Sequence, residues 1–132
     1  MKLVIGGYSQ GKLDYVLKDG VREDYCIFDG ILPDEGRLQE AIAQKKTVIV
    51  NHFHTWVKTC ILQEGNPDEE VQLFLENVPE CFIICDEIGN GIVPVDAFER
   101  EYRERTGRIL IMLAEQAHEV VRVICGIGQK IK

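Results

Sequence analysis

Seven residues near the start of the chain have the types and spacing that phosphate binding requires. The segment Gly6-Gly7-Tyr8-Ser9-Gln10-Gly11-Lys12 places four residues between two glycines and ends on a lysine. Such glycines let backbone N–H groups curl around a phosphate, and the lysine can reach the terminal phosphates of a nucleotide. A tight strand-to-helix turn with an exposed lysine is the alternative. The apolar run 2–5 and the helical pattern 12–17 favour phosphate binding, because a helix N-terminus attracts anions.

The residue after Lys12 departs from the usual phosphate loop. A Ser or Thr hydroxyl that binds Mg²⁺ is expected there, but the chain has Leu13. Magnesium would then be held by phosphate oxygens, water and another side chain, with Ser9 and Asp14 as candidates. We therefore expect residues 6–13 to bind ATP or GTP, while transfer of a phosphoryl group is less directly supported.

Two acidic residues follow an apolar run that we predict to be a strand. Asp86 and Glu87 come directly after residues 81–85. The carboxyl ends of strands are where α/β sheets present groups to ligands, so both acids are expected near the phosphate loop. They could hold Mg²⁺ or accept a proton from an acceptor hydroxyl. The alternative is a pair of solvated acids in a turn.

Two histidines follow another predicted strand, residues 47–50. His52 and His54 alternate along the chain and can share a face, as nucleophile, substrate contact or metal ligands. The alternative is a pair of polar loop residues beside a packed Trp56.

The elements that position these residues alternate along the chain. Short apolar runs, several rich in Val and Ile, predict five strands, at 2–5, 25–28, 47–50, 81–85 and 120–125. Helical spacing predicts helices between them, at 35–45, 55–62, 67–76 and 95–115. Gly107 interrupts the last pattern and predicts a bend, a boundary or close packing. This alternation indicates an α/β fold with a mostly parallel central sheet flanked by helices.

Composition limits the classes of protein and partner. The 132 residues fit one domain, 1–132, and the net charge of −7 opposes nucleic acid and anionic membranes as partners. A single phosphorylated metabolite remains compatible with that charge. The first residues are too short an apolar run for a signal peptide, and five cysteines, mostly in apolar runs, favour reduced, buried thiols. We therefore expect a cytoplasmic protein.

Three segments in the second half of the chain carry a resemblance to a known family. They are Asp86-Glu87-Ile88-Gly89-Asn90-Gly91-Ile92-Val93-Pro94, then Thr106-Gly107-Arg108, and finally residues 125–132. With the N-terminal loop, their order and spacing resemble the adenosylcobinamide kinase / adenosylcobinamide-phosphate guanylyltransferase family of cobalamin biosynthesis. The similarity covers residues 1–18 and 81–132 well, and 46–64 loosely.

The resemblance implies a P-loop kinase-like fold, often assembled as a trimer, so a homo-oligomer is expected. It implies phosphoryl transfer from ATP or GTP to the hydroxyl of a corrinoid, adenosylcobinamide. Transfer of GMP to that phosphate through a guanylylated histidine follows in the family. Candidate catalytic residues are then Lys12, Glu87, His52 and His54. Candidate substrate or phosphate contacts are Asp86, Gly89, Gly91 and Arg108, and candidate Mg²⁺ ligands are Asp86 and Glu87.

The middle of the chain departs from the family pattern. The family's guanylylated histidine precedes the third strand, but residues 19–47 contain no histidine and are fewer than usual. Asp86 replaces an Asn, and Asn51 stands where an acidic residue is typical. The leading hypothesis is a shortened adenosylcobinamide kinase without the guanylyltransferase half. The alternatives are a nucleotide- or corrinoid-binding regulatory or assembly protein, and a degenerate domain kept for oligomerisation.

Overall fold

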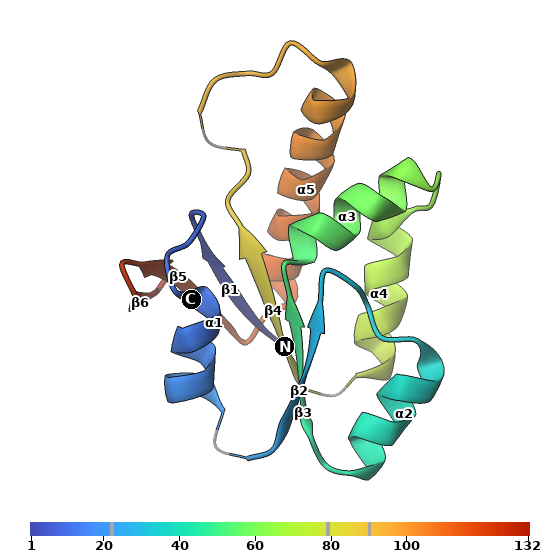
Figure 1. The fold of residues 1–132 in the computed structure, drawn as a ribbon, viewed down its shortest axis with the longest axis vertical. Coiled ribbons are helices and arrows are strands. Elements are labelled where there is room, and N and C mark those ends of the chain that lie inside the picture. Colours follow the sequence, from blue (N-terminus) through green and yellow to red (C-terminus); the bar gives the residue numbers. More distant parts are fainter. Residues whose placement is uncertain (22, 79, 90) are drawn as a thin grey trace.

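The computed structural model describes residues 1–21, 23–78, 80–89 and 91–132, in which helices flank a six-stranded sheet (Figure 1). The strands are β1 (Lys2–Gly6), β2 (Tyr25–Asp29), β3 (Thr47–Asn51), β4 (Cys81–Asp86), β5 (Glu119–Ile124) and β6 (Ile127–Lys130). The helices are α1 (Lys12–Tyr15), continued by a π-helical turn Val16–Gly20, then α2 (Glu35–Ala43), α3 (Phe53–Leu62), α4 (Pro67–Asn77) and α5 (Ala97–Gln116).

The sheet has the order β2-β3-β4-β1-β5-β6. All neighbours pair in parallel except β5 and β6, which form an antiparallel hairpin. The mostly parallel sheet is therefore confirmed, and β6 is a sixth strand beyond the five expected. Its residues, Ile127–Lys130, are mostly exposed, so no buried apolar run marked them in the sequence.

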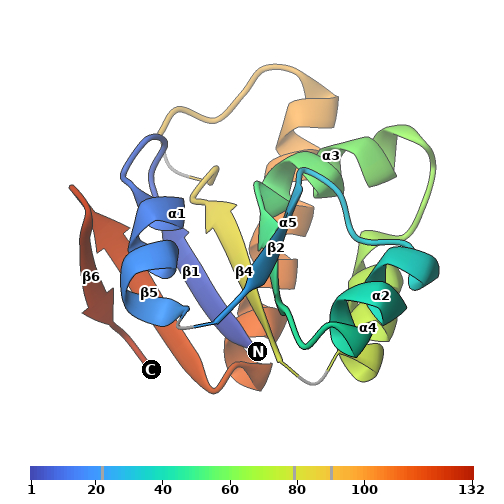
Figure 2. The same cartoon turned by 60° about the horizontal axis from the view of Figure 1, so that its bottom comes forward.

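Helices cover the two faces of the sheet unequally. The larger apolar cluster packs α2, α3, α4 and α5 on one face, with Phe53, Val57 and Leu113 fully buried. On the other face α1 and the turn after it pack Val16 against Val4 and neighbouring strand residues. Figure 2 shows α1 and α5 on opposite sides of the sheet. No helix in the described ranges has the length and apolar character needed to cross a membrane.

Local signals account for the N-terminal ends of two helices. Asp34 and Asp96 accept hydrogen bonds from the backbone N–H groups of Arg37 and Glu99, which caps the first turns of α2 and α5. The boundary or close packing expected at Gly107 is wrong, because α5 runs through this residue and a Cβ here would have no described atom within 4 Å. Cys125 was expected in a buried strand but lies exposed in the β5–β6 turn.

Candidate functional site

The phosphate loop joins β1 to α1, and two of its glycines are required by the backbone. A Cβ on Gly6 would lie 2.5 Å from the carbonyl oxygen of Val123, so a side chain there would push β1 away from β5. Gly11 has φ 83, in the left-handed region that only glycine adopts without strain. Ser9 also has a positive φ, of 55. The loop therefore turns back on itself directly before α1 begins.

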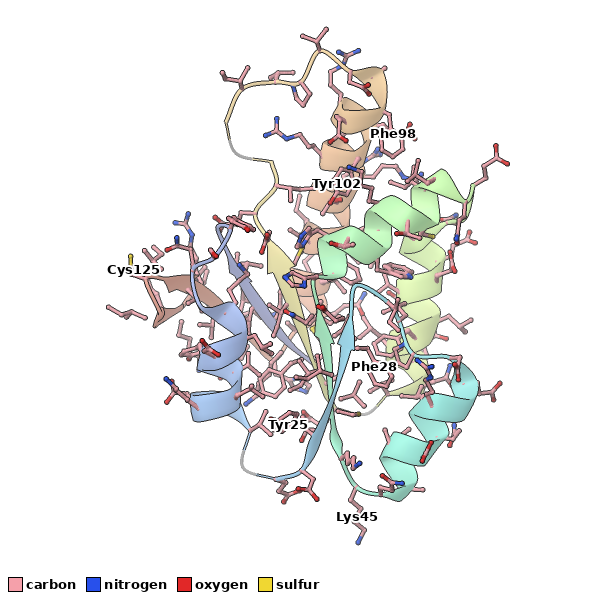
Figure 3. The ribbon with its side chains drawn as sticks, viewed as in Figure 1. Tyr25, Phe28, Lys45, Phe98, Tyr102 and Cys125 are labelled. Carbon is pink, nitrogen blue, oxygen red and sulfur yellow. The ribbon has the colours of Figure 1, made fainter. Side chains whose placement is uncertain are left out.

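The far side of the loop is fastened to the β5–β6 turn. The side-chain Oε1 of Gln10 accepts a hydrogen bond from the Cys125 N–H at 2.8 Å, and its backbone oxygen accepts one from Gly126 at 2.8 Å. Figure 3 shows Cys125 at this turn, with its side chain directed away from the sheet. The C-terminal hairpin thus supports the loop from a segment that is distant in sequence.

Lys12 lies inside the loop with its charge already paired. Its Nζ donates to the Gly7 carbonyl at 2.6 Å and lies 2.7 Å from Oδ1 of Asp86. The side chains are only 7% and 15% exposed, so the pair is shielded from water. A buried lysine with a hydrogen-bonded counter-charge is held where a phosphate oxygen would replace or join that partner. The sequence predicted Asp86 near the phosphate loop, and its contact with Lys12 agrees with that position.

The polar side chains at the sheet edge share one face because of strand periodicity. Asp29, Asn51 and Asp86 are the last residues of β2, β3 and β4. Asn51 and Asp86 each come two residues after a side chain directed toward the α1 face, Ile49 and Ile84. The register pairs Asp29 with Asn51 and Gly6 with Asp86. The strand ends therefore deliver their polar groups beside the loop.

A pocket of about 300 Å³ lies where these groups meet the loop. It is lined by Tyr8, Ser9, Gln10, Gly11, Lys12, Leu13, Asp14, Asn51, His52 and Asp86. Leu13 also packs against the apolar cluster under α1, which fits a structural role for this side chain. Because the Leu13 side chain has no oxygen, magnesium in this pocket would need oxygens from other lining residues, such as Asp86, Ser9 and Asp14.

His54 supports Asp86 from the first turn of α3. The Asp86 backbone N–H donates to Nδ1 of His54 at 3.1 Å, so Nε2 carries the ring hydrogen and lies 3.5 Å from Oδ2 of Asp86. Burial lowers the pKa of His54 below its usual 6.5, against an opposing effect of Asp86. The Tyr102 hydroxyl donates to the His54 carbonyl at 2.9 Å, and Figure 3 shows Tyr102 directed from α5 toward this end of the sheet. His54 is therefore a neutral support of the Lys12 partner.

In His52 the other ring nitrogen, Nδ1, carries the hydrogen. Its Nδ1 lies 2.5 Å from Oδ1 of Asp29, and because a carboxylate only accepts, Nδ1 carries the hydrogen and Nε2 is the acceptor. Asn51 also donates to Asp29, at 3.0 Å. His52 has φ 50, an uncommon conformation for a residue with a side chain and one that clusters at functional sites. An oriented, half-exposed imidazole at the pocket can accept a proton.

The remaining predicted site residues lie outside the pocket. Glu87 forms two hydrogen bonds with the Arg122 guanidinium, at 2.9 and 3.0 Å, and does not line the pocket. Gly89 and Gly91 are exposed in the segment after β4, while Asn90 of the same motif lies outside the described residues. Arg108 pairs with Glu104 on the exposed side of α5, at 3.3 Å. The structure thus brings together Lys12, Asp86, His52 and His54, and leaves these others at the margins.

Two residues that shape the site were missed by sequence reasoning. Asp29 orients His52 through a hydrogen bond to its ring, and Arg122 donates a hydrogen bond to the Glu87 carboxylate. Asp29 could have been found, because it directly follows the predicted strand 25–28, just as Asp86 follows 81–85. Arg122 carries no such signal, since its role depends on the pairing of β5 beside β1, where Ile5 is its register partner.

This strand order, with a glycine-rich loop after β1 and a buried lysine at the start of α1, defines a P-loop type of α/β protein. A family model described as cobinamide kinase / cobinamide phosphate guanyltransferase matches residues 32–131, and the chain belongs to this family.

Two curated relatives agree with this assignment. The bifunctional adenosylcobalamin biosynthesis protein CobU of Salmonella typhimurium is 31% identical over 119 residues, covering 83% of this chain and 65% of the relative. The protein of the same name from Escherichia coli K12 is 37% identical, with the same coverage. The chain thus spans just under two thirds of the length of the relatives that it matches.

Proposed function

We propose that the chain binds ATP or GTP at residues 6–13 and transfers the terminal phosphoryl group to the hydroxyl of a corrinoid such as adenosylcobinamide. The observation that carries this proposal is the Lys12 ammonium, buried within the loop and 2.7 Å from Asp86. Membership of a family described as cobinamide kinase / cobinamide phosphate guanyltransferase supports the choice of acceptor. The relatives named for adenosylcobalamin biosynthesis support the same pathway.

The loop residues have distinct roles in this proposal. Backbone N–H groups of the loop bind the phosphates, and Lys12 binds the terminal phosphate as its contact with Asp86 lengthens. Asp86, with Ser9 or Asp14, would hold Mg²⁺, which supplies neutralisation of phosphate charge when bound. Glu87 and His54 are positioning residues, because Glu87 is held by Arg122 and His54 acts through Asp86.

His52 is the proposed catalytic base. The acceptor oxygen forms a bond to the γ-phosphorus while the bond from that phosphorus to the bridging oxygen breaks, and nucleoside diphosphate leaves. Nε2 of His52 takes the hydroxyl proton, and Asp29 holds the resulting imidazolium. His52→Gln is expected to lower kcat by about 10²-fold or more, with a much smaller change in nucleotide affinity.

The transfer itself is tested by incubating the purified chain with Mg-ATP or Mg-GTP and adenosylcobinamide. The expected product is the phosphate ester, identified by mass spectrometry, with nucleoside diphosphate released in equal amount. Lys12→Ala is the control for dependence on the loop. Absence of both nucleotide binding and ester would contradict the proposal.

We propose further that the guanylyltransferase step is absent, because residues 19–47 contain no histidine. Incubation with GTP labelled on the α-phosphate is then expected to leave no acid-labile label on the protein. Label that disappears in His52→Ala or His54→Ala would contradict this and restore a covalent step.

A regulatory or assembly protein that binds nucleotide without turnover is the second candidate. Leu13 in place of a hydroxyl favours it, because a magnesium ligand is missing from the loop. Tight binding of GTP with no phosphorylated corrinoid would support it.

We also propose that the chain forms a homo-oligomer, with a trimer as the arrangement to test. Ile92, Val93 and Val95 are 92%, 71% and 94% exposed, and an apolar segment of this kind favours burial against another surface. Arg103 donates to the Ile92 carbonyl at 2.6 Å, which holds this segment to α5. Sedimentation equilibrium tests the oligomer, and a monomer at all concentrations would contradict it.

A further inference from the structure

A hollowed surface lies between the β2–α2 loop and helices α2, α3 and α4, outside the phosphate pocket. Two hollows of about 450 and 500 Å³ share Leu32, Trp56 and Glu70 in their walls. We call the combined surface the Trp56 groove. The fold explains it, because β2 is the edge strand and the loop after it passes over α3 before α2 begins. Figure 1 shows α2, α3 and α4 together on this side of the molecule.

Two separate pieces of chain link the Trp56 groove to the phosphate pocket. Gly30 lines the groove directly after Asp29, the partner of His52, and its N–H donates to the Asn51 carbonyl at 2.8 Å. Trp56 lies four residues after His52, the N-cap of α3, which is just over one helical turn, or about 6 Å along the axis. A ligand in the groove could therefore extend a short arm to His52.

The chemistry of the groove differs from that of the phosphate pocket. Its walls combine aromatic and aliphatic side chains with carboxamides, and its charged members are all acidic, Glu35 and Glu70. A phosphate or another anion is disfavoured beside two carboxylates. A flat apolar ring with amide N–H donors and positive charge is favoured.

Glu70 is held in place at the centre of the groove. The Cys60 thiol donates to Oε2 of Glu70 at 2.7 Å. Burial and the nearby carboxylate raise the pKa of Cys60 to about 12, so the thiol remains a donor. A Cβ on Gly65 would lie 2.8 Å from both the Cys60 sulfur and Oε2 of Glu70, so glycine there keeps the contact possible. The carboxylate is thus pre-oriented by its surroundings.

We propose that the Trp56 groove binds the corrin ring of the acceptor, while its hydroxyl arm reaches His52 at the phosphate pocket. The inference rests on the proposed function, since it places the acceptor of that reaction. It commits to a corrinoid because the cobalt corrin core is flat, carries positive charge and is surrounded by amide side chains. The flat ring matches the aromatic wall of the groove, the positive charge matches its carboxylates, and the amide side chains match its carboxamides.

Fluorescence of Trp56 tests the proposal directly, because it is the single tryptophan of the chain. Cobinamide is titrated into the protein without nucleotide, with N-acetyltryptophanamide as the control for light absorbed by the corrinoid. Saturable quenching gives Kd. Leu73→Lys, which places a cation in the groove wall, and Glu70→Lys are each expected to raise this Kd at least tenfold.

Leu62→Lys is the matched control. Leu62 is 63% exposed and Leu73 is 61% exposed, but only Leu73 lines the groove. The control is expected to change the cobinamide Kd less than twofold, and all three variants should keep the ATP-induced rise in Tm. That rise shows that the variants are folded and that the phosphate pocket is intact.

The outcomes separate this inference from the proposed function. Unchanged cobinamide affinity in both groove variants, with phosphorylation of cobinamide intact, would overturn the groove assignment and leave the kinase. Failure of the unmodified chain to bind cobinamide, with ATP binding retained, would overturn both the groove and the acceptor. A lower oligomeric state in Leu73→Lys, but not in Leu62→Lys, would show that the groove is an interface between copies and would overturn the proposal.

Discussion

At the residue scale, the site depends on how the buried Lys12 charge is balanced. Asp86 neutralises Lys12, and His54 contacts Asp86 through both ring nitrogens. A nucleotide must therefore compete with a carboxylate for Lys12, and part of its binding free energy is offset by loss of this contact. The balance can be shifted by changing Asp86 alone.

Asp86→Asn is expected to tighten nucleotide binding in the absence of magnesium. An amide is a weaker partner for Lys12 than a carboxylate. If the contact that ATP must displace is weaker by about 1.4 kcal/mol, the ATP Kd falls about tenfold. Titration calorimetry in EDTA measures this. Asp19→Asn is the control, because Asp19 is exposed on the turn after α1 and does not line the pocket. Equal ATP affinity in both variants would show that Asp86 does not restrain Lys12.

His54 gives the stability a dependence on pH. Burial lowers its pKa below 6.5 in the folded protein, so the unfolded chain binds the extra proton more readily. The contribution of neutral His54 to the free energy of unfolding is full above about pH 6.5. It is lost as the pH falls toward the lowered pKa of His54 in the folded protein. Urea unfolding at pH 7.5 and 5.5 should show a larger loss of stability for the unmodified chain than for His54→Asn, which retains an acceptor but does not titrate. An equal loss in both proteins would contradict this.

The sequence predicted the positions of some site residues but not all of their partners. Lys12 and Asp86 could be placed together because both follow strands whose carboxyl ends meet at one edge. The partner of Glu87 could not, since Arg122 reaches it from a strand 35 residues away in sequence. Local patterns indicate where a side chain stands on its own strand, while its partner depends on which strands become neighbours.

At the scale of the elements, the glycines separate into those that the fold requires and one that it does not. Gly6 faces the Val123 carbonyl at the β1–β5 junction, whereas Gly107 faces open space within α5. Glycine patterns alone predicted a disturbance at Gly107, because helix interiors usually exclude it. The β6 strand was missed for the converse reason, since its exposed residues lack an apolar pattern.

Gly6→Ala and Gly107→Ala are expected to change the free energy of unfolding in opposite directions. The Cβ at residue 6 would lie 2.5 Å from a backbone oxygen that cannot move without disturbing β5, so we expect destabilisation of about 1 to 3 kcal/mol. Alanine at residue 107 meets no described atom within 4 Å and should stabilise α5 by about 0.5 to 1 kcal/mol. Urea denaturation at 25 °C measures both, and a destabilised Gly107→Ala would mean that a neighbour outside the described contacts requires the glycine.

At the scale of the whole molecule, the phosphate loop connects several strands of the sheet. Lys12 links it to the end of β4, and Gln10 links it to the turn between β5 and β6. The loop thus lies between segments from the beginning, middle and end of the chain. Ligand binding at such a point stabilises the folded state as a unit, because the unfolded chain has no loop to bind.

Nucleotide binding is therefore expected to raise the Tm of the entire domain. At a free ATP concentration 100 times Kd, the stabilisation is about 2.7 kcal/mol, or roughly 10 °C for a chain of this size. Hydrogen exchange at the Cys125 and Gly126 amides, which bond to Gln10, should slow in parallel. Gln10→Ala should weaken this protection more than it weakens ATP binding.

Lys12→Ala separates specific binding from general effects of a polyanion on an acidic protein of net charge −7. The variant should lose the ATP-induced rise in Tm, whatever its own Tm without ligand, since no other lysine or arginine lines the pocket in the described structure. Inorganic phosphate at the same ionic strength should leave the unmodified chain almost unchanged. If no nucleotide shifts the Tm of the unmodified chain, the result would instead favour a degenerate domain kept for oligomerisation. Loss of phosphate binding would then leave assembly as the function to test.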